Sequence, residues 1–230
     1  MTRLSLLSML AICSAGVAAL YPLPSPGSYA QFVAPRIATA GDIPYPINTT
    51  ATGMVTLLLR LDAMGKIQNV RVLRDIPPLT SAAQTAVQSW TFTPAALNGN
   101  PVPARLSVNV VFNPYDPGGV AIEGLSLPLP PTTPGPNDSE LFPAQVTSAT
   151  FAVYPVNTVA SGTVVLNATI GKTGGVEKVR VIRGVPSLTP QCIRAVKSWG
   201  FDAATHEGKP VTSHAGVAFV FPSPAVANPG

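Results

Sequence analysis

The chain consists of one sequence unit used twice. When the sequence is shifted against itself by 109 residues, matching residues coincide without a gap: Tyr45 falls on Tyr154, Gly53 on Gly162, Trp90 on Trp199, Phe92 on Phe201 and Phe112 on Phe221. These are apolar, turn and aromatic residues, the kinds that decide a fold, so the pattern indicates duplication of a structural unit. The function is therefore to be sought in what one unit does and in why two are joined.

Length and charge narrow the possible classes of protein. The 230 residues suit two small domains of about 75 to 80 residues each. The net charge of +4 is spread along the chain as single Lys and Arg residues, so the basic cluster expected of a nucleic-acid-binding protein is missing and no nucleic-acid partner is predicted. Outside the N-terminus no apolar run approaches the roughly 20 residues of a membrane-spanning helix.

The N-terminus has the pattern of an export signal. A positively charged start at Thr2-Arg3 precedes an apolar stretch and small residues that suit cleavage near Ala19. The alternative is an uncleaved anchor, because the apolar stretch is about 17 residues long, at the lower limit for spanning a bilayer. Cleavage would remove Cys13 and leave Cys192 without an intrachain disulfide partner.

Composition divides the chain into segments with Pro-rich connections. The predicted order is a signal peptide or uncleaved anchor at 1–19, a lead-in linker at 20–35, a first module at 36–114, a Pro-rich spacer at 115–143, a second module at 144–224 and a tail at 225–230. The spacer contains seven prolines with several glycines, a composition typical of a semi-extended linker.

Each module begins with an alternating pattern that predicts a β-hairpin. In the first copy Gly53 to Leu61 alternates, a turn with Gly65 follows, and Ile67 to Leu73 alternates again. In the second copy the same pattern runs from Gly162 to Ile170 and from Val176 to Ile182.

A helix is predicted next, with an apolar stripe that ends in tryptophan. Thr189 before Pro190 suits an N-cap hydroxyl followed by a proline at the first helical position. The stripe consists of Cys192, Ala195, Val196 and Trp199 in the second copy and of Ala83, Ala86, Val87 and Trp90 in the first. The predicted structural core comprises Trp90, Phe92, Trp199, Phe201 and Cys192.

A last alternating segment closes each module, from Val102 to Phe112 and near Ala215 to Phe221. The predicted fold class is therefore α+β, with two tandem small modules, each strand-strand-helix-strand, in which one helix packs on a three-stranded antiparallel sheet. Such a sheet has edges, and an unpaired edge is either blocked or used.

Both copies carry a series of short motifs in the same order. The first copy has Tyr45-Pro46, Gly53, Val70-Arg71-Val72, Leu79, Ala86-Val87, Trp90-Thr91-Phe92-Thr93-Pro94, Gly99 and Pro101-Val102. The second copy keeps Tyr154-Pro155, Gly162, Val179-Arg180-Val181, Leu188, Ala195-Val196, Trp199-Gly200-Phe201, Gly208 and Pro210-Val211, but has Ala203 in place of the proline. This order of motifs resembles the C-terminal domain of the TonB family of bacterial energy transducers.

The resemblance implies a periplasmic protein that binds an extended segment of a TonB-dependent outer-membrane transporter by adding it to a sheet edge. The expected docking edges are the last strands, at Leu106, Val108 and Val110 and at Ala215, Val217 and Phe219. The first 20 residues lack the His that a full transducer of this family commonly carries in its anchor. Coupling to a proton-driven motor is therefore left open, and membrane contact is expected only through an uncleaved N-terminus.

Other candidate sites have a structural interpretation beside the functional one. Cys192 aligns with Ala83 on the core-facing stripe, which favours a buried and inert thiol over a redox site. His206 and His214 occur only in the second copy and lack nearby Cys residues or paired carboxylates, so no metal site is predicted. Arg71 and Arg180 suit solvated strand positions or, alternatively, contacts with a partner's carboxylate.

No arrangement of residues points to catalysis. The carboxylates are scattered, no Gly-rich phosphate loop follows a strand, and neither His has an evident partner. No enzyme activity and no cofactor are expected. The alternative to transporter binding is an envelope scaffold or self-associating module whose edges pair with copies of themselves and that has no transport role.

Overall fold

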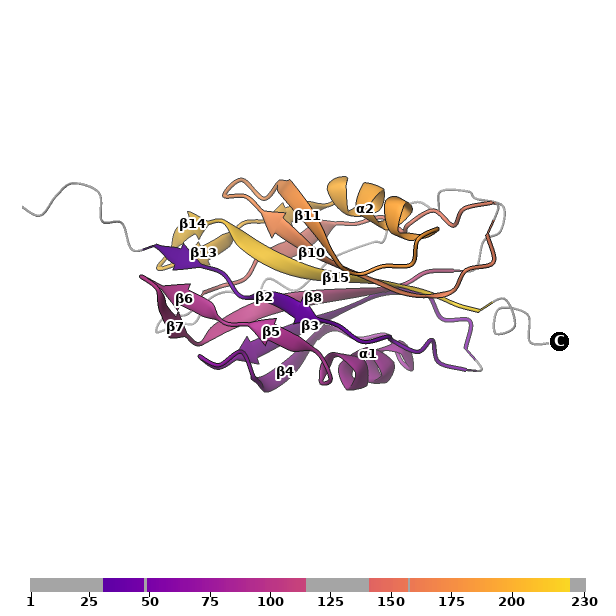
Figure 1. The fold of residues 1–230 in the computed structure, drawn as a ribbon, viewed down its shortest axis with the longest axis horizontal. Helices are drawn as coiled ribbons and strands as arrows, with labels where there is room; N and C mark the ends of the chain where they lie inside the picture. Colours follow the sequence, from indigo (N-terminus) through magenta and orange to yellow (C-terminus); the bar gives the residue numbers. More distant parts are fainter. Residues whose placement is uncertain (1–30, 48, 115–140, 157, 224–230) are drawn as a thin grey trace, which may run out of the picture.

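The computed structural model describes residues 31–47, 49–114, 141–156 and 158–223. Its main sheet has six strands in the order β11-β10-β15-β8-β3-β4, as Figure 1 shows. The first half of the chain supplies β3 (Gly53–Leu61), β4 (Ile67–Arg74) and β8 (Ala104–Phe112), and the second supplies β10 (Gly162–Ile170), β11 (Val176–Arg183) and β15 (Ser213–Phe221). The expected signal segment, most of the spacer and the tail lie outside the described residues.

The two predicted hairpins are present. β3 pairs with β4 and β10 with β11, both antiparallel. Each turn contains a glycine in the left-handed region, Gly65 with φ +80° and Gly174 with φ +84°, which a residue without a Cβ adopts at little steric cost. A Cβ at Gly65 would also collide with the carbonyl oxygen of Phe92, so the turn rests directly on the chain that follows the helix.

Each half has one helix, α1 (Leu79–Val87) and α2 (Thr189–Lys197), whose predicted stripe faces the sheet. Cys192 and Val196 of α2 are buried. The predicted N-cap role of Thr189 is wrong, because Thr189 is the first helical residue and Leu188 holds the cap position without a side-chain hydrogen bond. The Thr189 hydroxyl instead donates to the Val185 carbonyl and accepts from the Val185 amide, at 2.8 and 3.0 Å.

Short strands connect these elements and cover the faces of the sheet. The remaining strands are β1 (Phe32–Val33), β2 (Arg36–Thr39), β5 (Thr91–Thr93), β6 (Ala95–Leu97), β7 (Asn100–Val102), β9 (Gln145–Ser148), β12 (Gly200–Asp202), β13 (Ala204–His206) and β14 (Lys209–Val211). β2 pairs with β5 and β9 with β12, so the segment that leads into each half returns to the strand after its helix. β1 lies within the predicted lead-in linker, and Phe142, which forms an isolated bridge with Thr205 of the second half, lies within the predicted spacer.

The two helices cover opposite faces of the sheet (Figure 1). One core contains Trp90 and the residues beneath α1, and the other contains Trp199 and the residues beneath α2. Each core also takes residues from the other half, such as Ala218 in the first and Val111 in the second. The halves therefore share their hydrophobic interior.

The α+β class is confirmed, but the sheet arrangement differs from the expected pair of separate three-stranded sheets. Each half contributes three antiparallel strands, and β15 pairs with β8 to make one continuous sheet. The physical reason is that both halves carry an unpaired apolar last strand, and joining the two satisfies both rows of backbone groups at once. Among the described residues no helix is long and apolar enough to cross a membrane.

Candidate functional site: the sheet edges and the joint between the halves

The expected docking strands are the two central strands of the sheet. Each of the named residues is 0% exposed: Leu106, Val108 and Val110 on β8, and Ala215, Val217 and Phe219 on β15. β8 pairs with β3 on one side and with β15 on the other. The expectation that these strands carry free edges is therefore wrong for this conformation. That a partner binds at these residues stays a prediction.

The pairing of β8 with β15, here called the joint, is parallel and shifted by one residue from the repeat. Ser107 lies opposite Ala215, although its counterpart in the repeat is Gly216. β8 and β15 run in the same direction, and the two helices lie on opposite faces of the sheet. The two halves are therefore related by an approximate rotation of 180° about an axis parallel to these strands. A half-turn points counterparts to opposite faces, whereas neighbours in a sheet share a face. Counterparts therefore cannot be neighbours, and a shift of one residue is required.

A small polar cluster lies at the joint. The Thr56 hydroxyl donates to Asn109 Oδ1 at 3.1 Å, and Asn109 Nδ2 lies 3.5 Å from both Ser107 Oγ and the Gly216 carbonyl oxygen. The second copy has Val165, Gly216 and Ala218 at the positions of Thr56, Ser107 and Asn109. The polar cluster is thus confined to one copy.

The joint also depends on close approach at Gly216. A Cβ there would lie 2.7 Å from Ile37 Cδ1 and 3.1 Å from Val108 Cγ2. A contact of 2.7 Å is shorter than Cβ atoms make in proteins. The absence of a Cβ at Gly216 therefore allows β2 to pack against β15. β2, at the start of the first half, is in this way held against the second half.

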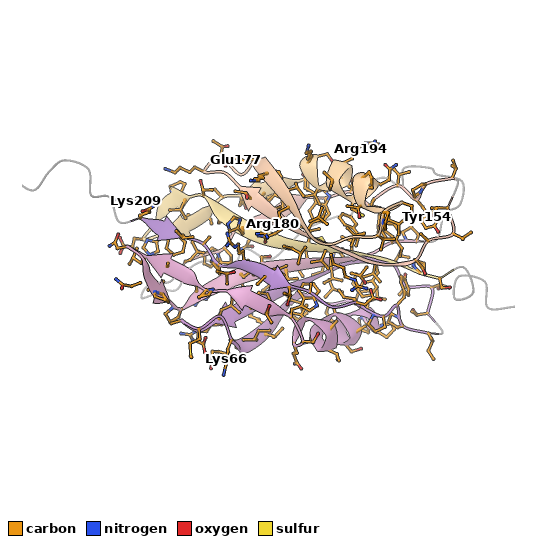
Figure 2. All side chains as sticks on the ribbon, in the orientation of Figure 1. Lys66, Tyr154, Glu177, Arg180, Arg194 and Lys209 are labelled. Atoms are coloured by element: carbon orange, nitrogen blue, oxygen red, sulfur yellow. The ribbon has the colours of Figure 1, made fainter. Side chains whose placement is uncertain are left out.

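The free edges of the six-stranded sheet are β4 and β11. Each pairs with one strand only among the described residues. Both carry charged side chains along an edge that is otherwise suitable for pairing, including Arg71 on β4 and its counterpart Arg180 on β11, a usual protection of exposed edges. Figure 2 shows Arg180 on β11 and Lys66 pointing outward at the turn before β4.

A groove runs between β4 and α1. One part has a volume of about 750 Å³ and is lined by Lys66, Gln68, Asn69, Gln84, Gln88 and Trp90, among others. A second part of about 520 Å³ continues past Val72 and Asp75 and shares Gln84 with the first. Side-chain amides from both the strand and the helix therefore face one channel beside a free sheet edge.

The corresponding region of the second half is more closely packed. α2 lies against both β10 and β11, whereas α1 lies against β3. At the position of Gln84 the second half has Ile193, which packs on the core together with Val176 and Val179 of β11. β2 also lies close to β11, and the Asp42 carboxylate lies 3.7 Å from the Arg183 guanidinium. The two free edges are consequently unlike.

The predicted core residues are buried as expected. Trp90 is 5% exposed, Phe92 7%, Trp199 4%, Phe201 6% and Cys192 0%. Burial raises the pKa of the Cys192 thiol far above its usual range, so little reactive thiolate forms.

The two histidines contact different residues. The ring of His206 stacks on Phe32 at 5.0 Å, and His214 Nδ1 lies 3.4 Å from Thr169 Oγ1. Within the described ranges no three His, Cys, Asp or Glu residues gather as a metal site would require. Both histidines instead pack against neighbouring side chains, His206 against Phe32 and His214 against Thr169.

Lowering the pH is expected to destabilise the fold through His214. Its pKa is lowered from 6.5 by burial and then by the nearby Arg36 guanidinium. A depressed folded-state pKa means that the unfolded chain binds the proton more readily, so stability is complete above the unfolded pKa and falls as the pH drops below it. Urea midpoints between about pH 7.5 and pH 5 would measure this. His214→Gln should flatten that part of the profile, and an unchanged slope would contradict the assignment.

Sequence reasoning missed the amide groove. Its signal is present in the sequence, because Gln84 and Gln88 stand where the second copy has Ile193 and Lys197. This difference between the copies could be interpreted only after the structure placed both glutamines beside β4, a strand with a free edge.

Comparison with protein families matches residues 46–114 and 156–222 to the Gram-negative bacterial TonB protein C-terminal family. The two matches cover both halves and include every strand of the six-stranded sheet. Comparison with curated proteins and with solved structures gives no match. A domain of this family mediates protein interaction. The chain belongs to the TonB C-terminal family and carries its domain twice.

Proposed function

We propose that this protein acts in the periplasm by binding an extended segment of a TonB-dependent outer-membrane transporter at a sheet edge, as a component of energy-coupled transport. The observation that carries the proposal is the match of both halves to the TonB C-terminal family, together with two sheet edges that remain unpaired among the described residues. An extended guest would gain backbone hydrogen bonds along such an edge, and its alternate side chains would supply specificity.

Hydrogen exchange tests this proposal. The purified chain is mixed with synthetic segments from the periplasmic side of outer-membrane transporters, and amide exchange is followed strand by strand. Binding should slow the exchange of amides along one edge strand, and the same segments with N-methylated alternate residues should not bind. Failure of every segment to bind would contradict the proposal. Protection or loosening centred on β8 and β15 would mean instead that the partner opens the joint.

The second candidate is a self-associating envelope scaffold, and the joint favours it. β8 and β15 already pair with each other within one chain, so self-pairing of the last strands is a property of this fold. Sedimentation distinguishes the candidates. A scaffold built through further edges should form larger assemblies as concentration rises, whereas a transporter-binding module should stay a monomer and bind an added extended segment.

A further inference from the structure

We propose that the guest site is the groove between β4 and α1, and that its ligand is an extended segment bearing carboxylates, which adds to β4 as a further strand of the sheet. This rests on the proposed function and names the edge and the chemistry of the guest. The family match names no docking strand, and the sequence-based expectation placed the docking site on the last strand of each copy, so neither singles out β4.

The first step is the choice between the free edges. β11 is backed by α2, and the Ile193 side chain that packs there leaves no counterpart of Gln84. β2 lies near its other side, where Asp42 meets Arg183. α1 packs mainly against β3, and a groove of about 750 Å³ opens between α1 and β4. β4 is therefore the edge with room for the side chains of an added strand.

The lining of the groove suits a peptide backbone. Gln84 of α1 and Gln88, the C-cap residue of α1, lie one turn apart and both line the groove, as expected for positions i and i+4. A side-chain amide both donates and accepts hydrogen bonds. Two such groups can thus bond to the backbone or to polar side chains of a guest without requiring a particular sequence.

The charge of β4 indicates carboxylates on the guest. β4 contains no acidic residue, although Asp75 follows its end and lines the second part of the groove, and Arg71 near the centre of β4 is exposed. The nearest acidic residue of the preceding turn, Asp62, already accepts hydrogen bonds from the Met64 and Lys66 amides and from Gln68. Val70 and Val72 line the groove, so Arg71 lies on the other face of β4. A carboxylate on that face of the added strand, opposite Arg71, would form a favourable cross-strand pair.

The same charges disfavour a second copy of the chain as the guest. Arg71 and Arg180 stand at equivalent positions of the two free edges. Pairing β4 of one molecule with β4 or β11 of another so that these positions meet would place arginine opposite arginine, and like charges opposite each other destabilise a sheet. A guest with the opposite charge meets no such penalty.

The experiment measures fluorescence anisotropy of a labelled peptide that alternates valine and glutamate, titrated with the full chain. Arg71→Glu and Gln84→Ile should each weaken binding about tenfold or more, equivalent to about 1.4 kcal/mol. Arg180→Glu, the matched change on β11, should alter the dissociation constant by less than about twofold. A peptide with lysine in place of glutamate should bind at least about tenfold more weakly.

Each other outcome overturns the inference. Binding that is weakened only by Arg180→Glu would place the site on β11. If none of the three variants affects binding, the groove is not the guest site, although the guest could still add to another sheet edge. Absence of binding up to about 1 mM would reject an acidic segment as the guest. The hydrogen-exchange experiment with transporter segments would then test the proposed function separately. A concentration-dependent dimer that the peptide cannot dissociate would identify a second copy as the occupant. Arg71 and Arg180 are exposed, so unchanged circular dichroism serves as the folding control.

Discussion

Trp199→Ala is expected to lower the free energy of unfolding by about 3 to 5 kcal/mol, the usual cost of removing a buried aromatic side chain. Trp199 packs on Phe219 and Phe201 with ring centroids 5.7 and 6.3 Å apart. Its Nε1 also donates to the Thr150 carbonyl at 3.1 Å. The substitution therefore creates a cavity and removes a hydrogen bond that ties the segment before the second half to the sheet.

Trp90→Ala is the matched comparison. Trp90 is buried to the same degree, but its Nε1 has no hydrogen-bond partner among the described residues. We expect its loss to cost about 1 kcal/mol less than the loss of Trp199, the net value of a typical hydrogen bond. Denaturant unfolding of both variants measures the difference, and a larger loss from Trp90→Ala would contradict this ranking.

The same variants test whether the halves unfold together. The chain has two tryptophans, so the fluorescence of Trp199→Ala reports on the first half alone. Because the halves share a sheet and exchange core residues, the fluorescence transition should coincide with that of circular dichroism, as for a single cooperative unit. Separate transitions would show that the joint contributes little to stability.

Proline within the joint is expected to have the second large effect. Neighbouring residues of a strand direct their N–H groups to opposite sides, and β15 is paired on both sides. Val217→Pro and Ala218→Pro should each remove a ladder hydrogen bond and leave a buried carbonyl without its donor. Each should destabilise the protein by more than about 4 kcal/mol, the range of severe substitutions.

The free edge supplies the control for these prolines. β4 is paired on one side only, so either Asn69 or Val70 directs its N–H to the free side. One of Asn69→Pro and Val70→Pro should therefore be much milder than its neighbour. Thermal unfolding of the four variants measures the contrast. If both prolines in β15 are tolerated, the joint is not a paired ladder in solution.

Local structure could be predicted because each signal lies within a few residues. The alternation from Gly53 to Leu61 and from Gly162 to Ile170 predicts β3 and β10 with their observed bounds. The stripe that ends in Trp90 and Trp199 correctly predicts which helix face is buried. Thr189 is the local exception, because its hydroxyl bonds to Val185 and holds the preceding loop.

The joint could not be predicted from these local patterns. Alternating Leu106, Val108 and Val110 indicate one buried face, and a strand at an edge gives the same pattern as a central one. The intervening residues Ser107 and Asn109 are buried as well. In the sequence, however, their polar side chains suggest a face that is exposed to solvent. Only the partner strand, which lies more than 100 residues later in the chain, makes a buried Asn at this position understandable.

The parallel joint also affects how the chain reaches its native state. β8 pairs with β3 of its own half on one side. Because β8 ends at Phe112 and β15 begins at Ser213, the other side of β8 has no native partner until about 100 further residues have been made, which takes roughly 5 to 20 s at usual rates of synthesis. During that interval the open side of an apolar strand is available to other nascent chains. Folding should consequently be slow for a protein of this size and sensitive to crowding by incomplete copies of itself.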